Sequence, residues 1–270
     1  MVRASLWTHG AAAAALAAQP GLWAELAALL AANHAVLGAC MHPQAGLLGT
    51  NLRRLPDGAA GVALTFDDGP DPAVTPRVLD LLDAHQARAT FFVIGTRAAT
   101  HPGLVREMLR RGHAVENHSH RHHGLFAARG PRALWREVGE AQAAIADAGG
   151  VAPRFFRAPM GLRSPLLDPV LAMHGLTLVS WSRRGHDALR REPAAVLARL
   201  TRNLAARDIL LLHDGNSALT RDGRPVVLEV LPRLLDVLAA RGLATLPLSV
   251  GAGHPVAAAA AASPARAARA

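Results

Sequence analysis

The residues of this chain best suited to chemistry are two adjacent carboxylates, Asp67 and Asp68, which follow an apolar run over residues 61–66. Side chains alternate between the faces of a strand, but this rule relaxes at a strand's end, so both acids can face one pocket. Two neighbouring anions beside an apolar strand are costly unless a cation or a proton lies between them. Asp-Gly-Pro is also ordinary turn chemistry, so the pair alone does not distinguish a site from a polar turn.

A second reactive group is the stretch 116–123, which contains four of the fourteen histidines. His118 and His122 are four residues apart, so one helical turn would place both imidazoles on the same side. Imidazoles in this arrangement suit a divalent first-row metal, most commonly zinc. With an acid from another strand end, they predict a His-His-Asp metal site that leaves positions open for water and substrate. A polar histidine-rich loop without metal is the alternative for the cluster taken by itself.

Further polar residues follow three later apolar runs. Arg157 precedes an Ala-Pro-Met-Gly turn, and such irregular turns can leave backbone N–H groups free to stabilise an oxyanion. His213 ends the apolar run 209–212, where a histidine with a tunable pKa suits general acid catalysis. Trp181 ends another run, and Asp187 follows it. Taken alone, Arg157 also fits a loop cap and His213 a hydrogen-bonded structural histidine.

The elements that position these residues alternate between strand and helix patterns from residue 62 onward. We predict strands over 62–66, 90–94, 114–117, 154–157, 176–181, 209–213 and 243–246. Helical periodicity covers 76–85, 97–111, 131–148, 164–174, 193–205 and 226–241, with proline near several helix starts. This alternation indicates a largely parallel sheet with helical crossovers, open or closed into a barrel, in which reactive residues gather beyond the carboxyl ends of the strands.

Composition and charge limit the function classes. A chain of 270 residues, 51% of them hydrophobic, fits one large α/β domain plus tails. The formal charge is +9, but all basic residues are arginines scattered along predicted helices, with no long basic run interleaved with aromatics. We therefore predict no nucleic-acid partner. The single Cys40 excludes an intramolecular disulfide and a cysteine-rich zinc site.

The termini differ from the centre of the chain. Residues 1–50 contain an alanine run, a Pro-Gly break and a largely apolar segment over 22–41, which predict a helical hairpin. This hairpin is membrane-embedded, packed on a membrane surface or packed on the catalytic domain as a soluble element, and a cleaved signal peptide is a further alternative. We assign residues 55–250 to a catalytic domain and residues 251–270 to a disordered tail. The predicted location is the cell envelope with membrane association, and cytoplasmic or exported soluble forms are the alternatives.

The ordered set of motifs resembles the polysaccharide deacetylases with a NodB-homology domain, carbohydrate esterase family four, over residues 62–248. The stretches similar to family motifs are 65–70 for the first, 118–122 for the second, 157–161 for the third, 211–214 for the fifth and 89–95 for the usual second strand. The resemblance implies an α/β fold, a distorted (β/α) barrel of about seven parallel strands that is complete or incomplete, preceded here by the helical hairpin.

The resemblance also implies roles for the acids and histidines of the first two motifs. Asp67 would be the general base, and Arg157 would orient it. Asp68, His118 and His122 would bind a divalent metal, most commonly Zn²⁺, with Co²⁺ or another first-row ion as an alternative. These roles agree with the physical requirement that a metal-activated water needs a nearby base.

The remaining implied roles concern the leaving group and the substrate. His213 would be the general acid, since the departing amine needs a proton from a second group. The backbone N–H of Met160 would help to hold the oxyanion, Leu211 would line the pocket for the acetyl methyl, and Trp181 belongs with these substrate-binding residues.

The fourth motif departs from the family pattern, which usually shows an Asp, two residues and then Asp-Trp. Counting from Trp181 places Arg184 at the first Asp, Asp187 at the second and Ala188 at the Trp. Asp187 can still pair with His213, but Arg184 and Ala188 should change the substrate groove.

We therefore predict a metal-dependent hydrolase that removes N-linked acetyl groups from N-acetylated amino sugars of a polysaccharide or other glycan. One alternative is deacylation of a lipid-linked sugar, an O-acyl ester or a non-carbohydrate amide, for which the altered fourth motif and the apolar hairpin leave room. Another is a catalytically idle domain that binds envelope glycans, which the intact acids and histidines disfavour. The oligomeric state does not follow from the sequence.

Overall fold

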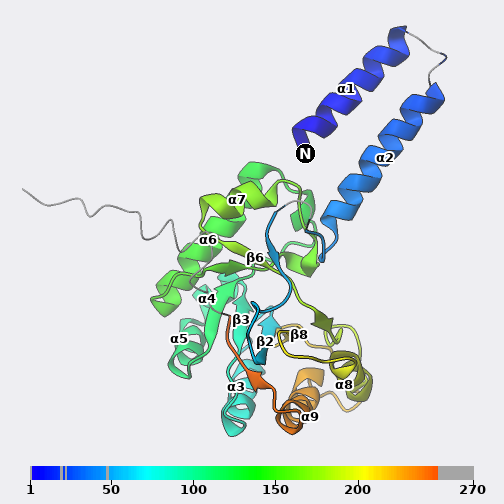
Figure 1. Cartoon of the computed structure of the whole chain (residues 1–270). Helices are drawn as coiled ribbons and strands as arrows, with labels where there is room; N and C mark the ends of the chain where they lie inside the picture. Colours follow the sequence, from blue (N-terminus) through cyan, green and yellow to red (C-terminus); the bar gives the residue numbers. More distant parts are fainter. Residues whose placement is uncertain (1, 19–20, 22, 47–48, 249–270) are drawn as a thin grey trace, which may run out of the picture.

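The computed structural model describes residues 2–18, 21, 23–46 and 49–248 (Figure 1). The predicted disordered tail over 251–270 lies outside these residues. The described chain forms a parallel sheet with helices packed around it, and an N-terminal pair of helices projects from this body.

The sheet is built around β2 (Gly61–Asp67), the longest strand, which pairs in parallel with β8 (Ile209–His213) and with β3 (Thr90–Val93). The sheet continues from β3 through β4 (Ala114–Asn117), β5 (Phe155–Phe156) and β6 (Thr177–Val179) to β1 (Asn51–Leu52). On the other side of β8 lies β7 (Arg183–Arg184), and β9 (Ala244–Thr245) pairs with the start of β2. All named strand pairs in the described chain are parallel, as the sequence predicted.

One bent segment connects the two sides of the sheet. Strands β6 and β7 are separated only by residues 180–182, yet β6 pairs with β5 and β7 pairs with β8. Residues 180–182 therefore carry the chain from the β1–β6 edge of the sheet directly to the β8–β7 edge, without a helical crossover. The predicted distorted (β/α) barrel is confirmed, with nine strands in the described residues. Strands β1 and β7 were not predicted because each has two residues and no apolar run.

The helices that cover the sheet agree with the predicted ranges to within about four residues at their ends, except in one place. They are α3 (Thr75–Ala84), α4 (Gly95–Thr100), α5 (Pro102–Arg110), α6 (Pro131–Gly149), α7 (Leu167–Met173), α8 (Pro193–Thr201) and α9 (Val226–Ala240). The prediction of one helix over 97–111 was wrong, because His101 adopts φ −124° and ψ 54° between α4 and α5. The pyrrolidine ring of Pro102 disfavours the helical conformation at the residue before it, so the helix is interrupted there.

Alternation along the central strands separates the core from the site. Leu64, Phe66 and Leu212 belong to the large cluster that packs with the surrounding helices. Ala63 and Leu211 belong to a smaller cluster, on the opposite strand faces. Asp67 follows Ala63 by four residues and His213 follows Leu211 by two, so period-two alternation directs these polar side chains to the same side as the smaller cluster.

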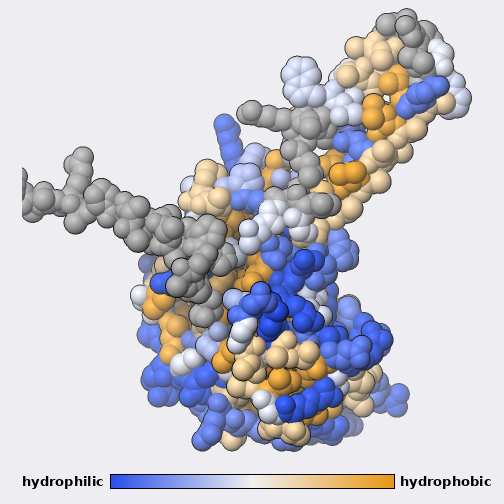
Figure 2. All heavy atoms as spheres, in the orientation of Figure 1, coloured by the Kyte–Doolittle hydropathy of each residue, from blue (hydrophilic) through white to orange (hydrophobic). Residues whose placement is uncertain are grey.

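The N-terminal residues form the predicted pair of helices, α1 (Val2–Ala18) and α2 (Trp23–Met41). The two helices contact each other, and the rings of His9 and His34 lie 5.1 Å apart. The pair extends away from the barrel in Figure 1, and Figure 2 shows many apolar residues on its surface. Trp7 is 79% exposed and Trp23 is 68% exposed, so large apolar side chains of both helices face outward.

Helix α2 meets the length and composition of a membrane-spanning helix. Its mean hydropathy over the most apolar window is 1.4, and it is the one such helix in the part of the chain that the structure describes. A signal sequence near an N-terminus has the same properties. The segment after α2 contacts the barrel, because Gln44 Nε2 donates to the Trp181 carbonyl at 2.7 Å and Ser180 Oγ donates to the Pro43 carbonyl at 2.6 Å.

Candidate active site

The site lies at the carboxyl ends of the parallel strands, where register brings distant residues together. Asp67 at the end of β2 is the parallel partner of His213 at the end of β8 and of Phe92 on β3. Asp68 follows in the left-handed region with φ 73°. This backbone turn interrupts strand alternation, so both adjacent acids line the same cavity of about 380 Å³.

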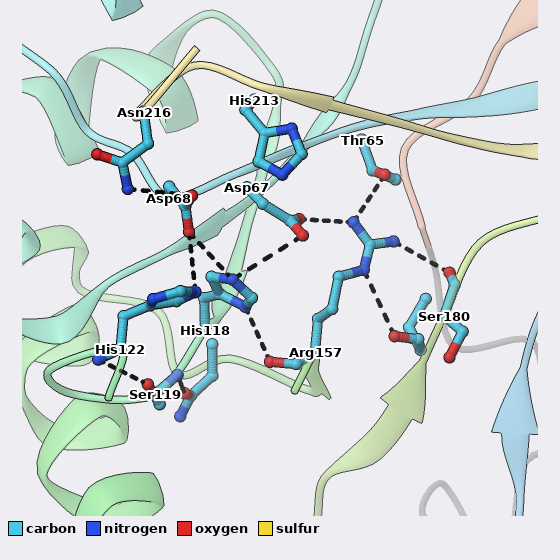
Figure 3. Close-up of polar contacts among 12 residues, drawn as sticks. Thr65, Asp67, Asp68, His118, Ser119, His122, Arg157, Ser180, His213 and Asn216 are labelled. Carbon is cyan, nitrogen blue, oxygen red and sulfur yellow. Dashed lines mark hydrogen bonds and ion pairs between the residues drawn. The ribbon is translucent and has the colours of Figure 1, made fainter. Parts of the chain in front are cut away.

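Asp68, His118 and His122 form a compact cluster of candidate metal ligands. Asp68 Oδ1 lies 3.2 Å from Nε2 of His118 and 3.2 Å from Nε2 of His122 (Figure 3). His118 comes from the loop that follows β4, and its Nδ1 donates to the Arg157 carbonyl at 2.9 Å. That hydrogen bond orients the imidazole so that Nε2 faces Asp68. The other carboxylate oxygen of Asp68 accepts from Asn216 Nδ2 at 3.1 Å.

The charges of this cluster explain the pKa of Asp68. Burial alone would raise the pKa of this carboxyl. The close contact with His118 Nε2 and the positive charges of His118, His213 and His122 outweigh burial and lower the pKa of Asp68 below its ordinary value. Asp68 is therefore an ionised carboxylate over the physiological pH range, which is the form that binds a cation.

Asp67 is held by a buried arginine rather than by the histidines. Arg157 Nη1 donates to Asp67 Oδ1 at 2.6 Å and to Thr65 Oγ1 at 2.8 Å, and Arg157 is only 1% exposed. Its Nη2 donates to the Ser180 carbonyl at 3.1 Å, and its guanidinium lies 4.0 Å from the centre of the Phe92 ring. In Figure 3, Asp67 lies between the ligand cluster and this guanidinium. The fixed guanidinium leaves Asp67 Oδ2 on the side of the cavity, 3.9 Å from His118 Nε2.

His213 is oriented by a buried carboxylate. Its Nδ1 donates to Asp187 Oδ1 at 2.9 Å, and its backbone N–H donates to Asp187 Oδ2 at 2.8 Å. Burial alone would lower the pKa of His213, but the charge and hydrogen bond of Asp187, with the charges of Asp67 and Asp68, raise it to about 9. His213 therefore retains its proton at neutral pH, and Nε2 is the ring nitrogen not bonded to Asp187.

Trp181, Met160 and Leu211 line the same cavity as the acids and histidines. Met160 lies in the one-turn 3₁₀ segment Pro159–Gly161 with φ 57°. Gly161 has φ 75°, and a Cβ added there would lie 2.3 Å from Cη2 of Trp181. The turn can therefore lie against the indole only with glycine at this position.

Several other residues of the site have strained backbone. Left-handed φ values at non-glycine residues are uncommon and gather at functional sites when the surrounding structure fixes them. Around this cavity they occur at Asp68, Ser119, His122, Met160, His186 and Asn216.

The structure brings all ten predicted site residues to one end of the barrel. Eight line the cavity: Asp67, Asp68, His118, His122, Met160, Trp181, Leu211 and His213. Arg157 and Asp187 lie behind it and contact Asp67 and His213 respectively. In the fourth motif, Arg184 and Ala188 also line the cavity, and the guanidinium of Arg184 lies 5.0 Å from the centre of the Trp181 ring.

Sequence reasoning missed three polar residues that support this arrangement. Thr65 precedes Asp67 by two residues on the same strand face, a signal that was available from alternation alone. Asn216 contacts Asp68 and also accepts from Arg97 Nη2 at 3.1 Å. Asn216 follows a strand end and Arg97 lies on α4, so no local pattern distinguishes them from ordinary surface residues.

The chain is similar to known deacetylases over most of its length. The polysaccharide deacetylase family model matches residues 55–179. A chitooligosaccharide deacetylase of Sinorhizobium fredii (strain NBRC 101917 / NGR234) is 40% identical over 191 residues, which cover 68% of this chain and 88% of the relative. A peptidoglycan-N-acetylglucosamine deacetylase of Bacillus cereus is 31% identical over 191 residues, which cover 70% of this chain and 86% of the relative.

Solved structures give the same result. The family 4 carbohydrate esterase from Streptomyces lividans in complex with acetate matches with a TM-score of 0.63 and 34% identity, covering 71% of this chain and 95% of that chain. The parallel barrel, the acids and histidines at its strand ends and the similarity to these deacetylases together place the chain among the carbohydrate-active hydrolases. The chain belongs to the polysaccharide deacetylase family.

Proposed function

We propose that this protein is a metal-dependent deacetylase that hydrolyses the N-acetyl group of an amino sugar in a glycan. The observation that carries the proposal is the meeting of three groups in one cavity: the ligand cluster, the Asp67–Arg157 pair and the His213–Asp187 pair. The names of the relatives, which are deacetylases of chitooligosaccharide and of peptidoglycan N-acetylglucosamine, support this substrate class. The acetate in the related esterase structure is the acid that such a reaction would release.

The ligand cluster fits a divalent cation. Asp68 Oδ1 is buried and has no hydrogen-bond partner in the described chain, although two imidazole Nε2 atoms lie 3.2 Å away. A carboxylate oxygen and two imidazole nitrogens are ligands that Zn²⁺ and Co²⁺ accept, and three protein ligands leave positions for water and substrate. When bound, such a metal supplies Lewis acidity that polarises the acyl carbonyl and acidifies water.

Asp67 is the proposed general base. Arg157 occupies Oδ1 of Asp67 and is itself held by Thr65, so Oδ2 remains on the cavity side. The carboxylate would take the proton of the attacking water at Oδ2. Arg157 acts only through Asp67 here and is a positioning residue.

His213 is the proposed general acid. Asp187 fixes Nδ1–H, so the proton available to the substrate is the one on Nε2. His213 would donate this proton to the departing nitrogen as the carbon–nitrogen bond breaks. A pKa of about 9 keeps the imidazolium populated at neutral pH.

The remaining lining residues fit the substrate. Leu211 and Trp181 would contact the acetyl methyl group, and the backbone N–H of Met160 would donate to the oxyanion. The cavity of about 380 Å³ accommodates one acetylated sugar unit near the reacting groups. We assign residues 55–250 to this catalytic domain.

The helical pair α1–α2 is proposed to attach the enzyme to a membrane of the cell envelope. The apolar α2 and the exposed Trp7 and Trp23 support this assignment, since tryptophan favours the membrane–water interface. Co-sedimentation of the full chain with lipid vesicles tests it. Recovery of the chain in the supernatant at every lipid concentration would contradict attachment.

The proposed reaction is tested by acetate release from metal-reconstituted enzyme. N-acetylated oligosaccharides, O-acetyl esters and a non-carbohydrate N-acetyl amide form the panel. We expect acetate from the N-acetylated sugars and much less from the other two classes. Metal bound at one equivalent, with glycan binding and no acetate released, would instead indicate an idle glycan-binding domain.

A further inference from the structure

A second cavity adjoins the catalytic one and has a different chemical character. Its volume is about 600 Å³, and it shares Trp181, Arg184 and His186 with the catalytic cavity. Its lining residues come from the segment after α2, from residues 181–186 in and around β7, and from α8 with the residue that follows it. They are His42, Pro43, Gln44, Trp181, Ser182, Arg183, Arg184, His186, Ala198, Arg199 and Arg202.

This second cavity carries positive charge that the protein does not neutralise. Four arginines line it, and none of its lining residues is acidic. Arg183 is paired with Asp208, at 2.9 Å from Nε to Oδ2. In the described residues, no carboxylate lies within ion-pair distance of Arg184, Arg199 or Arg202.

Arg184 connects the two cavities. It lies on β7, where the parallel register places it beside Leu211 of β8, and its guanidinium packs over the Trp181 ring at 5.0 Å. Its Nε is buried and has no hydrogen-bond partner in the described part of the chain. Arg184 and Arg199 also act on His186, since burial first and these two charges next lower the pKa of that imidazole. The guanidinium of Arg184 lines both cavities and has no carboxylate partner among the described residues, so it is arranged to receive an anion from outside the chain.

We propose that this basic cavity binds a phosphate or diphosphate group carried by the substrate next to its acetylated sugar, and that Arg184 selects for that group. This inference rests on the proposed deacetylase function, which it deepens by naming a substrate class. Planar guanidinium groups bind phosphate oxygens in a bidentate manner. A diphosphate diester carries two negative charges spread over several phosphate oxygens, so it can contact more of the three unpaired arginines than a single carboxylate can.

The position of the cavity relates this phosphate to the helical pair. Helix α2 ends at Met41, and the next three residues, 42–44, line the cavity. A sugar joined through phosphate to a lipid would thus place its charged group at the base of the apolar helices. A water-soluble sugar phosphate presents the same chemistry, so the experiment compares both sources.

The first test measures binding of inorganic pyrophosphate to the full-length holoenzyme by calorimetry. We expect Arg184→Asp and Arg199→Asp each to weaken binding by at least about tenfold, since each replaces attraction by repulsion. Arg199 lines only the basic cavity, so its effect separates this site from pyrophosphate bound at the metal ligands. Arg233→Asp, on an exposed face of α9, is the matched control and should bind as wild type does. Equal binding by all four proteins would overturn the proposal.

The second test compares acetate release from three substrates with the same acetylated sugar. These are the neutral sugar, its soluble nucleotide diphosphate ester and its polyprenyl diphosphate ester in vesicles. We expect kcat/KM to be at least about tenfold higher for the diphosphates than for the neutral sugar, and Arg184→Asp and Arg199→Asp to lose that preference. A higher value for the vesicle-borne ester identifies the lipid-linked source, and equal values for the two diphosphates indicate that the charged group alone is recognised.

Equal kcat/KM for neutral and phosphorylated sugars in wild type, or a preference that survives in both variants, would overturn the proposal. Failure of the proposed function gives a different result. In that case no substrate releases acetate, while pyrophosphate still binds in a manner that depends on Arg184 and Arg199.

Discussion

The catalytic cavity and the basic cavity share a wall but treat charge in opposite ways. In the catalytic cavity the two proposed proton-transfer groups have partners within the protein: Asp67 has Arg157, and His213 has Asp187. In the basic cavity, Arg184, Arg199 and Arg202 have no carboxylate partner among the described residues. Charges that are buried and paired within the protein are held in one geometry before substrate binds, which suits a single reaction. Charges without a partner at the surface can instead bind a ligand of opposite charge.

The largest expected effect comes from removing the candidate metal ligands. His118→Ala should abolish metal binding and acetate release together, because it removes one of three ligands and the buried partner of Asp68. Metal content by elemental analysis and acetate release are the measurements. His123→Ala is the control, since His123 contacts Glu137 at 3.3 Å and not the ligand cluster, and it should keep its metal. A metal-free but active His118→Ala enzyme would contradict the assignment.

Asp67→Asn separates the base from the metal ligands. The amide retains the size of the carboxylate but cannot accept a proton, so kcat should fall by about 10²–10⁴ with metal content unchanged. Steady-state acetate release and elemental analysis measure the two properties. The exposed Asp222→Asn is the control and should retain wild-type kcat. Native activity in Asp67→Asn would exclude this residue as the base.

Removal of Arg157 tests whether the paired charges are also structural. Arg157→Met leaves Asp67 buried beside Phe92 without its counter-ion, which should cost about 3–5 kcal/mol of unfolding free energy. Chemical denaturation monitored by circular dichroism gives this value. A loss below about 1 kcal/mol would show that solvent already reaches Asp67 in the native protein.

Asp187→Asn tests the pKa of the proposed acid. His213 acts in its protonated form, so the rate should fall as pH rises through its pKa of about 9. In Asp187→Asn, the charge that raises the pKa of His213 is removed while the burial that lowers it remains, so the pKa of His213 falls. The alkaline limb of the kcat profile should therefore move toward the ordinary histidine value of about 6.5. An alkaline limb at the same pH in both enzymes would assign that limb to another group.

The smallest expected effect on stability concerns the basic cavity. Arg199→Asp should change the unfolding free energy by no more than about 0.5 kcal/mol, because Arg199 is exposed and has no carboxylate partner in the described chain. The same denaturation assay used for Arg157→Met measures it. A loss comparable to that of Arg157→Met would show that the two cavities do not differ as described.

Prediction from sequence succeeded where the pattern is local. The strand over 114–117, the strand over 209–213 and the helix near 226–241 agree with β4, β8 and α9, because each is a continuous run with clear periodicity. It was wrong at 97–111, where the apolar pattern continues through a proline that interrupts the helix. It missed β7, whose two arginines form a strand only because β8 lies beside them.

The ten candidate site residues were found because the family motifs are contiguous in sequence, and the structure places them at one end of the barrel. Asn216 was not found, because its contact with Asp68 joins residues 148 positions apart. Thr65 was given no role, although strand alternation places it on the same face as Asp67. The basic cavity was not predicted either. Its arginines lie within residues 183–202, but they line one cavity only because α8 packs beside β7 and the segment after α2 closes the remaining side.

The parallel α/β architecture, the helical pair and the list of candidate site residues could be predicted from the sequence alone. Apolar periodicity and contiguous motifs are properties of neighbouring residues, so no tertiary contact is needed to recognise them. That Asp67 and Asp68 both face the cavity is known only from the three-dimensional fold, because it depends on the left-handed backbone at Asp68. Only the tertiary structure also decided which charges are paired, because a counter-ion is defined by distance in space and not by position along the chain.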